Sequence, residues 1–151
     1  MPFTLSAAFP PGRDTPDHVA LAERLGYARA WLYDSPALYH DVWMSLARCA
    51  ERTDTIGLGP AVLVPSLRHP MVTAAAVATL ADLAPDRVAV ALGAGFTGRH
   101  VLGQRAMRWD DVRARRYGAL GALLGVLLAW PMGFFAGAAT ALLLLLLSAV
   151  A

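Results

Sequence analysis

The first 92 residues alternate between short apolar runs and segments with helical character, and this alternation constrains the fold more than any other feature. Apolar runs at 3–9, 28–33, the start of 56–70, and 87–92 are typical of buried strands. Three helical segments separate them, giving the order β-α-β-α-β-α-β in units of about thirty residues. This order predicts an α/β fold with a parallel sheet. By itself it leaves open a doubly wound sheet or part of an eightfold (β/α) barrel.

The expected helices begin at recognisable signals. Thr15 is expected to cap the first helix with its hydroxyl, just before Pro16 in the first turn. Asp41 is expected to cap a helix over 42–51. Pro70 can open a helix over 70–83 as its first residue. These signals place the helix starts on the side where the preceding strands end.

The stretch 56–70 begins as a buried strand but cannot remain regular. Its prolines at 60, 65 and 70 fall five residues apart, and proline removes a ladder donor and fixes one backbone angle. We therefore expect a bulge or a break, followed by a polar-tipped loop carrying Arg68 and His69. In α/β proteins the carboxyl ends of parallel strands hold the ligand, so the candidate site is placed here.

Two other strand ends carry candidate site residues. Asp34 follows the apolar run 28–33, either as a turn former with Ser35 and Pro36 or as a carboxylate facing a pocket. The segment 93–98 formally matches the glycine fingerprint of dinucleotide folds, which requires an immediate helix and a later acidic residue. That acidic residue should end a second strand, whereas 99–109 contains another glycine and no strand follows. We therefore expect a glycine loop that lets a ligand approach the backbone, or a flexible turn.

Composition excludes several classes of function. All 13 basic residues are arginine, but the net charge is only +2, so the composition does not indicate nucleic-acid binding. The one cysteine, Cys49, lies in an apolar helical pattern and is expected to be a buried thiol in a reducing compartment. The four histidines show no metal-ligand spacing, so no metal site is predicted. With no secretory signal at the N-terminus, we expect a cytoplasmic protein.

Several motifs, in the right order, resemble the luciferase-like monooxygenase family. They are Trp31-Leu-Tyr-Asp-Ser-Pro-Ala-Leu-Tyr39, the stretch 57–70, Leu83-Ala-Pro-Asp-Arg-Val-Ala-Val90, and 93–99 together with 103–110. The resemblance covers roughly residues 3–113 and is strongest to the branch that uses the deazaflavin coenzyme F-420. It implies the N-terminal half of an eightfold (β/α) barrel, or TIM barrel, with four β/α units.

The resemblance also implies a function and a set of cofactor-contacting positions. The function is an oxidoreductase that transfers hydride with coenzyme F-420 or, alternatively, FMN, acting on a small-molecule substrate. A bulge in the third strand would hold a non-proline cis peptide between Ala61 and Val62. Asp34, Val64 and the loop Gly93-Ala94-Gly95 match cofactor-contacting positions, although Ala94 lacks the hydroxyl that relatives often carry there. No catalytic acid or base can be transferred, and a homo-oligomer is expected.

The end of the chain is chemically different. No charge follows Arg116, and residues 117–151 are apolar over a length sufficient to cross a membrane. We expect a boundary between a domain over 1–115 and a segment over 116–151. That segment is expected to be a transmembrane hairpin or kinked helix that weakly resembles DoxX-like membrane proteins, with a buried hairpin of a soluble core as the second alternative. Arg113, Arg115 and Arg116 would keep the preceding part cytoplasmic.

Three interpretations therefore remain. The first is an oxidoreductase of the luciferase-like family. The second is a small membrane-anchored protein without catalytic activity, attached through 117–151. The third is a truncated or fused half barrel, inactive alone, because four further β/α units are expected after the region around residue 109 and an apolar segment follows instead.

Overall fold

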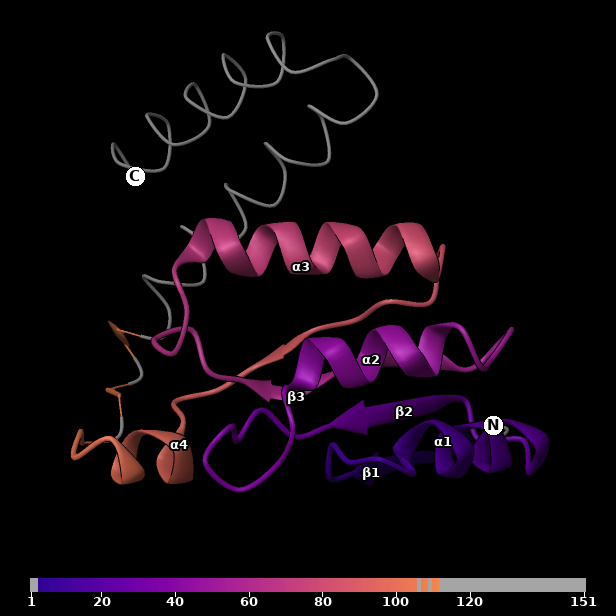
Figure 1. Cartoon of the computed structure of the whole chain (residues 1–151), viewed down its shortest axis with the longest axis horizontal. Helices are drawn as coiled ribbons and strands as arrows, with labels where there is room; N and C mark the ends of the chain where they lie inside the picture. Colours follow the sequence, from indigo (N-terminus) through magenta and orange to yellow (C-terminus); the bar gives the residue numbers. More distant parts are fainter. Residues whose placement is uncertain (1–2, 106, 109, 112–151) are drawn as a thin grey trace, which may run out of the picture.

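The computed structural model describes residues 3–105, 107–108 and 110–111. Strands and helices alternate through this part of the chain, as the apolar pattern predicts (Figure 1). The elements in chain order are β1 (Ser6–Phe9), α1 (Thr15–Arg24), β2 (Arg29–Leu32), α2 (Val42–Ala50), β3 (Gly57–Leu63), α3 (Pro70–Leu83), β4 (Ala91–Leu92) and α4 (Phe96–Val101).

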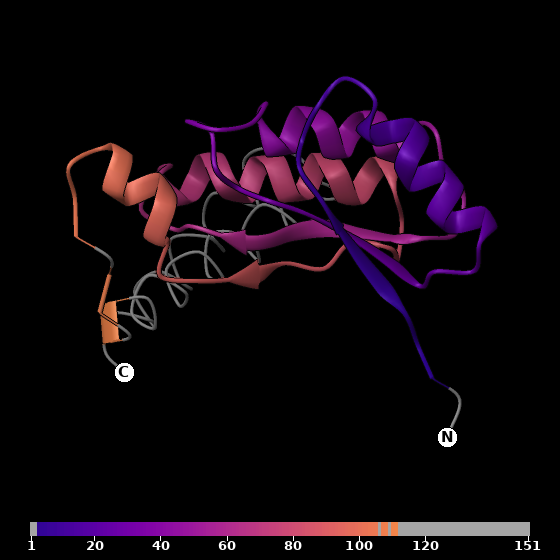
Figure 2. The ribbon, with the colours of Figure 1, turned by 90° about the horizontal axis from the view of Figure 1, so that it is seen from below.

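All three strand pairings are parallel, and the strand order is β1-β2-β3-β4. Figure 2 shows α1, α2 and α3 on the same face of this sheet. A doubly wound sheet would place helices on both faces and reverse its strand order at a switch point. Sequential strands with their helices on one face are instead the arrangement of consecutive units of a (β/α) barrel. The structure thus separates two folds that the alternation alone left open.

The hydrophobic core lies between the sheet and these helices. Leu32 of β2 and Leu58 of β3 point toward the helices and are completely buried, as is Leu46 of α2. Alternate residues of β2 face the other side of the sheet, where Arg29 lies over the ring of Trp31 at 5.1 Å. Burying a leucine side chain stabilises a fold by about 1.5–3 kcal/mol, so this layer anchors the strand ends that form the site.

All three helices begin where the sequence predicts, but the capping role expected for Thr15 is wrong. The Asp41 carboxylate accepts hydrogen bonds from the backbone N–H groups of Trp43 and Met44 at 2.9 and 3.0 Å. Helix α3 begins at Pro70 as expected. Thr15, however, does not cap α1, because its hydroxyl donates instead to the carbonyl oxygen of Pro10 at 2.8 Å and Asp14 occupies the cap position.

The third strand is distorted where its prolines predict a break. Its register against β4 shifts between Ala61 and Leu63. The expected fourth strand over 87–92 is correspondingly reduced to the two residues of β4, preceded by an isolated bridge between Leu58 and Val88. The shift interrupts the regular ladder between β3 and β4. The distorted residues lie at the end of β3, next to the end of β2 and to β4.

The predicted apolar segment over 116–151 and the expected domain boundary between 115 and 116 lie outside the described residues. Among residues 3–105, 107–108 and 110–111, no helix is long and apolar enough to cross a membrane.

Candidate functional site

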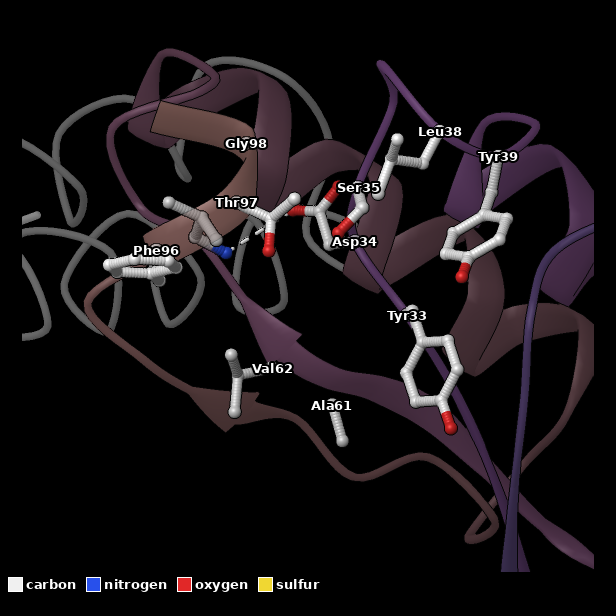
Figure 3. A pocket seen from close by; sticks show the side chains of 12 residues that line it. Tyr33, Asp34, Ser35, Leu38, Tyr39, Ala61, Val62, Phe96, Thr97 and Gly98 are labelled. Atoms are coloured by element: carbon white, nitrogen blue, oxygen red, sulfur yellow. Dashed lines mark hydrogen bonds between the residues drawn. The ribbon is translucent and has the colours of Figure 1, made fainter. Parts of the chain in front are cut away.

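A pocket of about 380 Å³ lies where β2 and β3 end and α4 begins. This is the carboxyl-end edge of the sheet, where the sequence predicts the site. Figure 3 shows Ala61 and Val62 between the rings of Phe96 and Tyr33. The lining residues are Tyr33, Asp34, Ser35, Leu38, Tyr39, Ala61, Val62, Val64, Gly95, Phe96, Thr97 and Gly98.

The distorted part of β3 forms the floor of this pocket. The peptide bond between Ala61 and Val62 is cis, which confirms the expectation for the bulge. The side chain of Val62 is 45% exposed although it follows a run of buried strand residues. The floor is therefore made of small apolar side chains, which suit the face of a flat ring better than a charged group.

Asp34 lines the pocket, but its carboxylate is not a free acceptor. The side chain is 1% exposed, and each of its oxygens lies 2.8 Å from Nη1 of Arg68. The backbone N–H of Val64 also donates to this carboxylate at 3.2 Å. Asp34 therefore ties the end of β2 to the segment after β3. It borders the pocket, but its carboxylate plays neither of the two roles considered from the sequence, because it is engaged by Arg68 and Val64.

The glycine loop closes the other side of the pocket and leads directly into a short helix, which the sequence analysis did not predict. Gly95 adopts a left-handed conformation with φ of 71° and directly precedes the short helix α4. An added Cβ on Gly95 would collide with the side chain of Val64, and one on Gly93 would lie 2.6 Å from a methyl carbon of Val62. Both glycines allow the loop to pack closely on the bulge.

The structure brings five of the seven predicted site residues to the pocket wall: Asp34, Ala61, Val62, Val64 and Gly95. Gly93 and Ala94 lie outside it. Gly93 donates its backbone N–H to the carbonyl oxygen of Leu63 at 3.0 Å, and Ala94 accepts from the backbone N–H of Met107 at 3.3 Å. These two residues position the loop that Gly95 ends.

Sequence reasoning missed the aromatic walls. Tyr33 and Tyr39 lie on one side with their ring centroids 6.0 Å apart, and Phe96 lies on the other, 78% exposed. Tyr33 and Phe96 directly neighbour the predicted residues Asp34 and Gly95, so sequence adjacency to a strand end was the available signal. Within the described part of the chain, no cluster of three or more histidine, cysteine or acidic side chains could hold a metal ion.

The described residues form an α/β fold with a parallel sheet of four strands, and the pocket lies at the carboxyl ends of β2 and β3. This is the edge where (β/α) barrels place their ligand sites. Residues 3–127 match the model of the luciferase-like monooxygenase family, and the chain belongs to that family. This confirms the resemblance drawn from the motifs.

The relatives found by comparison agree with this assignment. F-420-dependent glucose-6-phosphate dehydrogenase of Intrasporangium calvum is 31% identical over 114 residues, which are 68% of this chain and 34% of that protein. The chain thus spans about a third of the length of this curated relative.

Two solved structures are similar to the described fold. Coenzyme F-420-dependent tetrahydromethanopterin reductase from Methanopyrus kandleri aligns with a TM-score of 0.60 and 28% identity, over 66% of this chain and 30% of that chain. A type II Baeyer–Villiger monooxygenase, the oxygenating constituent of 3,6-diketocamphane monooxygenase from Pseudomonas putida in complex with FMN, aligns with a TM-score of 0.63. At 16% identity over 78% of this chain and 39% of that chain, the second structure supports the fold alone.

Proposed function

We propose that this chain carries the ring-binding site of an oxidoreductase that uses coenzyme F-420, with FMN as the alternative cofactor. The observation that carries the proposal is the pocket over the β3 bulge, whose floor is Ala61 and Val62 and whose sides are the aromatic rings of Tyr33 and Phe96. Two relatives more than 25% identical to this chain, a dehydrogenase and a reductase, are F-420-dependent by name.

The residues present fit a flat, largely apolar ring. The pocket volume of about 380 Å³ falls within the range of small-molecule sites, roughly 300–1,000 Å³. The Asp34 carboxylate is neutralised by Arg68, so the pocket wall does not present it as an unpaired charge to the ring. Ala61 and Val62 would support one face, and Asp34, Val64 and the loop 93–95 would border it. When bound, the cofactor would supply hydride transfer.

The activity, substrate and assembly of a whole enzyme are proposals, because the chain spans only about a third of its curated relative. We propose a small-molecule substrate at the open side of the pocket. We also propose a homo-oligomer, supported by β1 and β4, which are the two edges of the sheet within the described residues. A cytoplasmic location is supported by a single cysteine that is buried as a thiol. Membrane attachment through 117–151 stays a prediction from sequence.

The direct test is a titration of the detergent-solubilised full chain with coenzyme F-420 and, separately, with FMN. Ligand fluorescence would report binding. We expect saturable binding of at least one cofactor with a dissociation constant in the micromolar range, equivalent to about −8 kcal/mol. An absence of binding up to about 500 μM would refute the proposal, because it means a binding free energy less favourable than about −4.5 kcal/mol.

A further inference from the structure

The guanidinium of Arg68 joins two carboxylates that lie far from it in the sequence. Its Nη1 contacts both oxygens of Asp34 at 2.8 Å, and its Nη2 lies 3.2 Å from Oδ2 of Asp41. The Arg68 side chain is only 15% exposed, and that of Asp34 is 1% exposed. A partly buried, doubly paired arginine of this kind is held more firmly than an exposed ion pair.

The two carboxylates stand at the two ends of one segment, residues 35–40. Asp34 precedes this segment at the end of β2, and Asp41 follows it as the cap of α2. The segment contributes Ser35, Leu38 and Tyr39 to the pocket wall, whereas Arg68 itself does not line the pocket. One guanidinium therefore closes the segment at both ends without reaching the ligand site.

We propose that Arg68 is a positioning residue that clamps the segment 35–40 against the pocket and thereby sets the affinity for the bound ring. The ligand part of this proposal rests on the proposed function. The planar guanidinium can contact two carboxylates in different directions at once, whereas a lysine ammonium acts as a single compact charge. Lysine at this position would neutralise buried Asp34 but release Asp41. Charge neutralisation and clamping can therefore be separated.

The first experiment needs no cofactor. Hydrogen exchange of the ligand-free full chain reports the segment through the backbone N–H groups of Leu38 and Tyr39, which donate to the carbonyl oxygen of Ser35 at 2.9 and 3.0 Å. We expect Arg68→Lys and Asp41→Asn each to speed exchange at these two amides about tenfold while exchange within α3 is unchanged. Asparagine retains a side-chain oxygen that can cap α2, so Asp41→Asn removes the ion pair and leaves the cap acceptor in place.

The control is Arg52→Lys, because Arg52 pairs with Asp17 at 3.0 Å on the surface, where both side chains are 65% exposed. This variant should exchange like the wild type at Leu38 and Tyr39. The double variant Arg68→Lys/Asp41→Asn should exchange no faster than the single variants, because either change alone opens the same clamp.

The second experiment measures cofactor affinity in the same variants. If the wild type binds, Arg68→Lys and Asp41→Asn should each weaken binding about tenfold, and Arg52→Lys should not. Unchanged exchange at Leu38 and Tyr39, or unchanged affinity in variants of a binding wild type, would overturn the proposal for Arg68. A wild type that binds neither cofactor would refute the proposed function instead, and the exchange experiment would still decide whether Arg68 clamps the segment.

Discussion

Gly59 of β3 lies directly against the carbonyl group of Ala89, with which a Cβ atom at position 59 would collide. The close approach belongs to the pairing between β3 and the segment before β4, where the N–H of Ala89 donates to the carbonyl oxygen of Leu58 at 3.0 Å. The same Cβ would lie 3.3 Å from the ring of Trp31. The missing side chain at Gly59 thus lets the fourth strand segment join the sheet and carry the glycine loop to the pocket.

Gly59→Ala should lower the free energy of unfolding by about 3 kcal/mol, because the clash is with backbone that cannot rotate away. Urea unfolding followed by circular dichroism would measure the change. Gly12→Ala is the control, since a Cβ there would make an ordinary contact of 3.5 Å with the hydroxyl of Thr15. Equal stabilities of the two variants would contradict the observed packing of Ala89 on β3.

Glu23 of α1 should make stability depend on pH. Burial raises the pKa of its carboxyl group, but hydrogen bonds from Thr55, Ile56 and Asp54 outweigh burial and hold the pKa below its ordinary value of 4.5. Because the folded state favours the ionised form, this stabilisation is complete above the unfolded pKa and is lost as pH falls through the folded value. The stability difference between the wild type and Glu23→Gln should therefore shrink on acidification from pH 7 to pH 3.

The exposed Asp82→Asn of α3 serves as the control for Glu23. Its stability difference from the wild type should stay small over the same pH range, as expected for a surface substitution. A difference for Glu23→Gln that grew toward low pH would show that the sign of the Glu23 effect is wrong.

Cys49 should be chemically inert in the folded protein. Burial in the core raises the pKa of its thiol to about 12, against a smaller opposite effect of the neighbouring Arg48. Since only the thiolate reacts, and about one part in 10⁴ is ionised at pH 8, labelling by a disulfide reagent should require unfolding. Native protein should label slowly and urea-unfolded protein within seconds to minutes. Equally fast labelling of both would place Cys49 outside the core.

Phe96 should matter for the ligand and little for the fold. Its ring is 78% exposed at the rim of the pocket, so Phe96→Ala should change the free energy of unfolding by less than about 0.5 kcal/mol. The loss of an aromatic wall should weaken cofactor binding several-fold. Leu102→Ala, 60% exposed just beyond α4 and outside the pocket lining, should leave binding unchanged. Identical affinities of the two variants would remove Phe96 from the site.

Local signals predicted the elements well where one interaction dominates. Pro70 and the Asp41 carboxylate start α3 and α2 as expected, and the proline spacing located the bulge in β3. The Thr15 prediction failed because a capping hydroxyl can also satisfy a carbonyl brought close by the chain before the helix, here that of Pro10.

What the sequence could not reveal depends on contacts between distant segments. The pairing of Arg68 with Asp34 spans 34 residues, and no local sequence pattern predicts it. Helix α4 has only six residues and contains Gly98, so its pattern is too short to predict a helix. The two-residue length of β4 follows from the register shift in β3 rather than from its own composition.

The most direct test of the proposed site is to map backbone amide chemical shifts of the full chain while coenzyme F-420 or, in a separate sample, FMN is added. The proposed site predicts saturable shifts concentrated at Val62, Val64 and Gly95, with helix α1, which contributes no residue to the pocket wall, undisturbed. Shifts that cluster on another face of the sheet, or none at saturating cofactor, would contradict it.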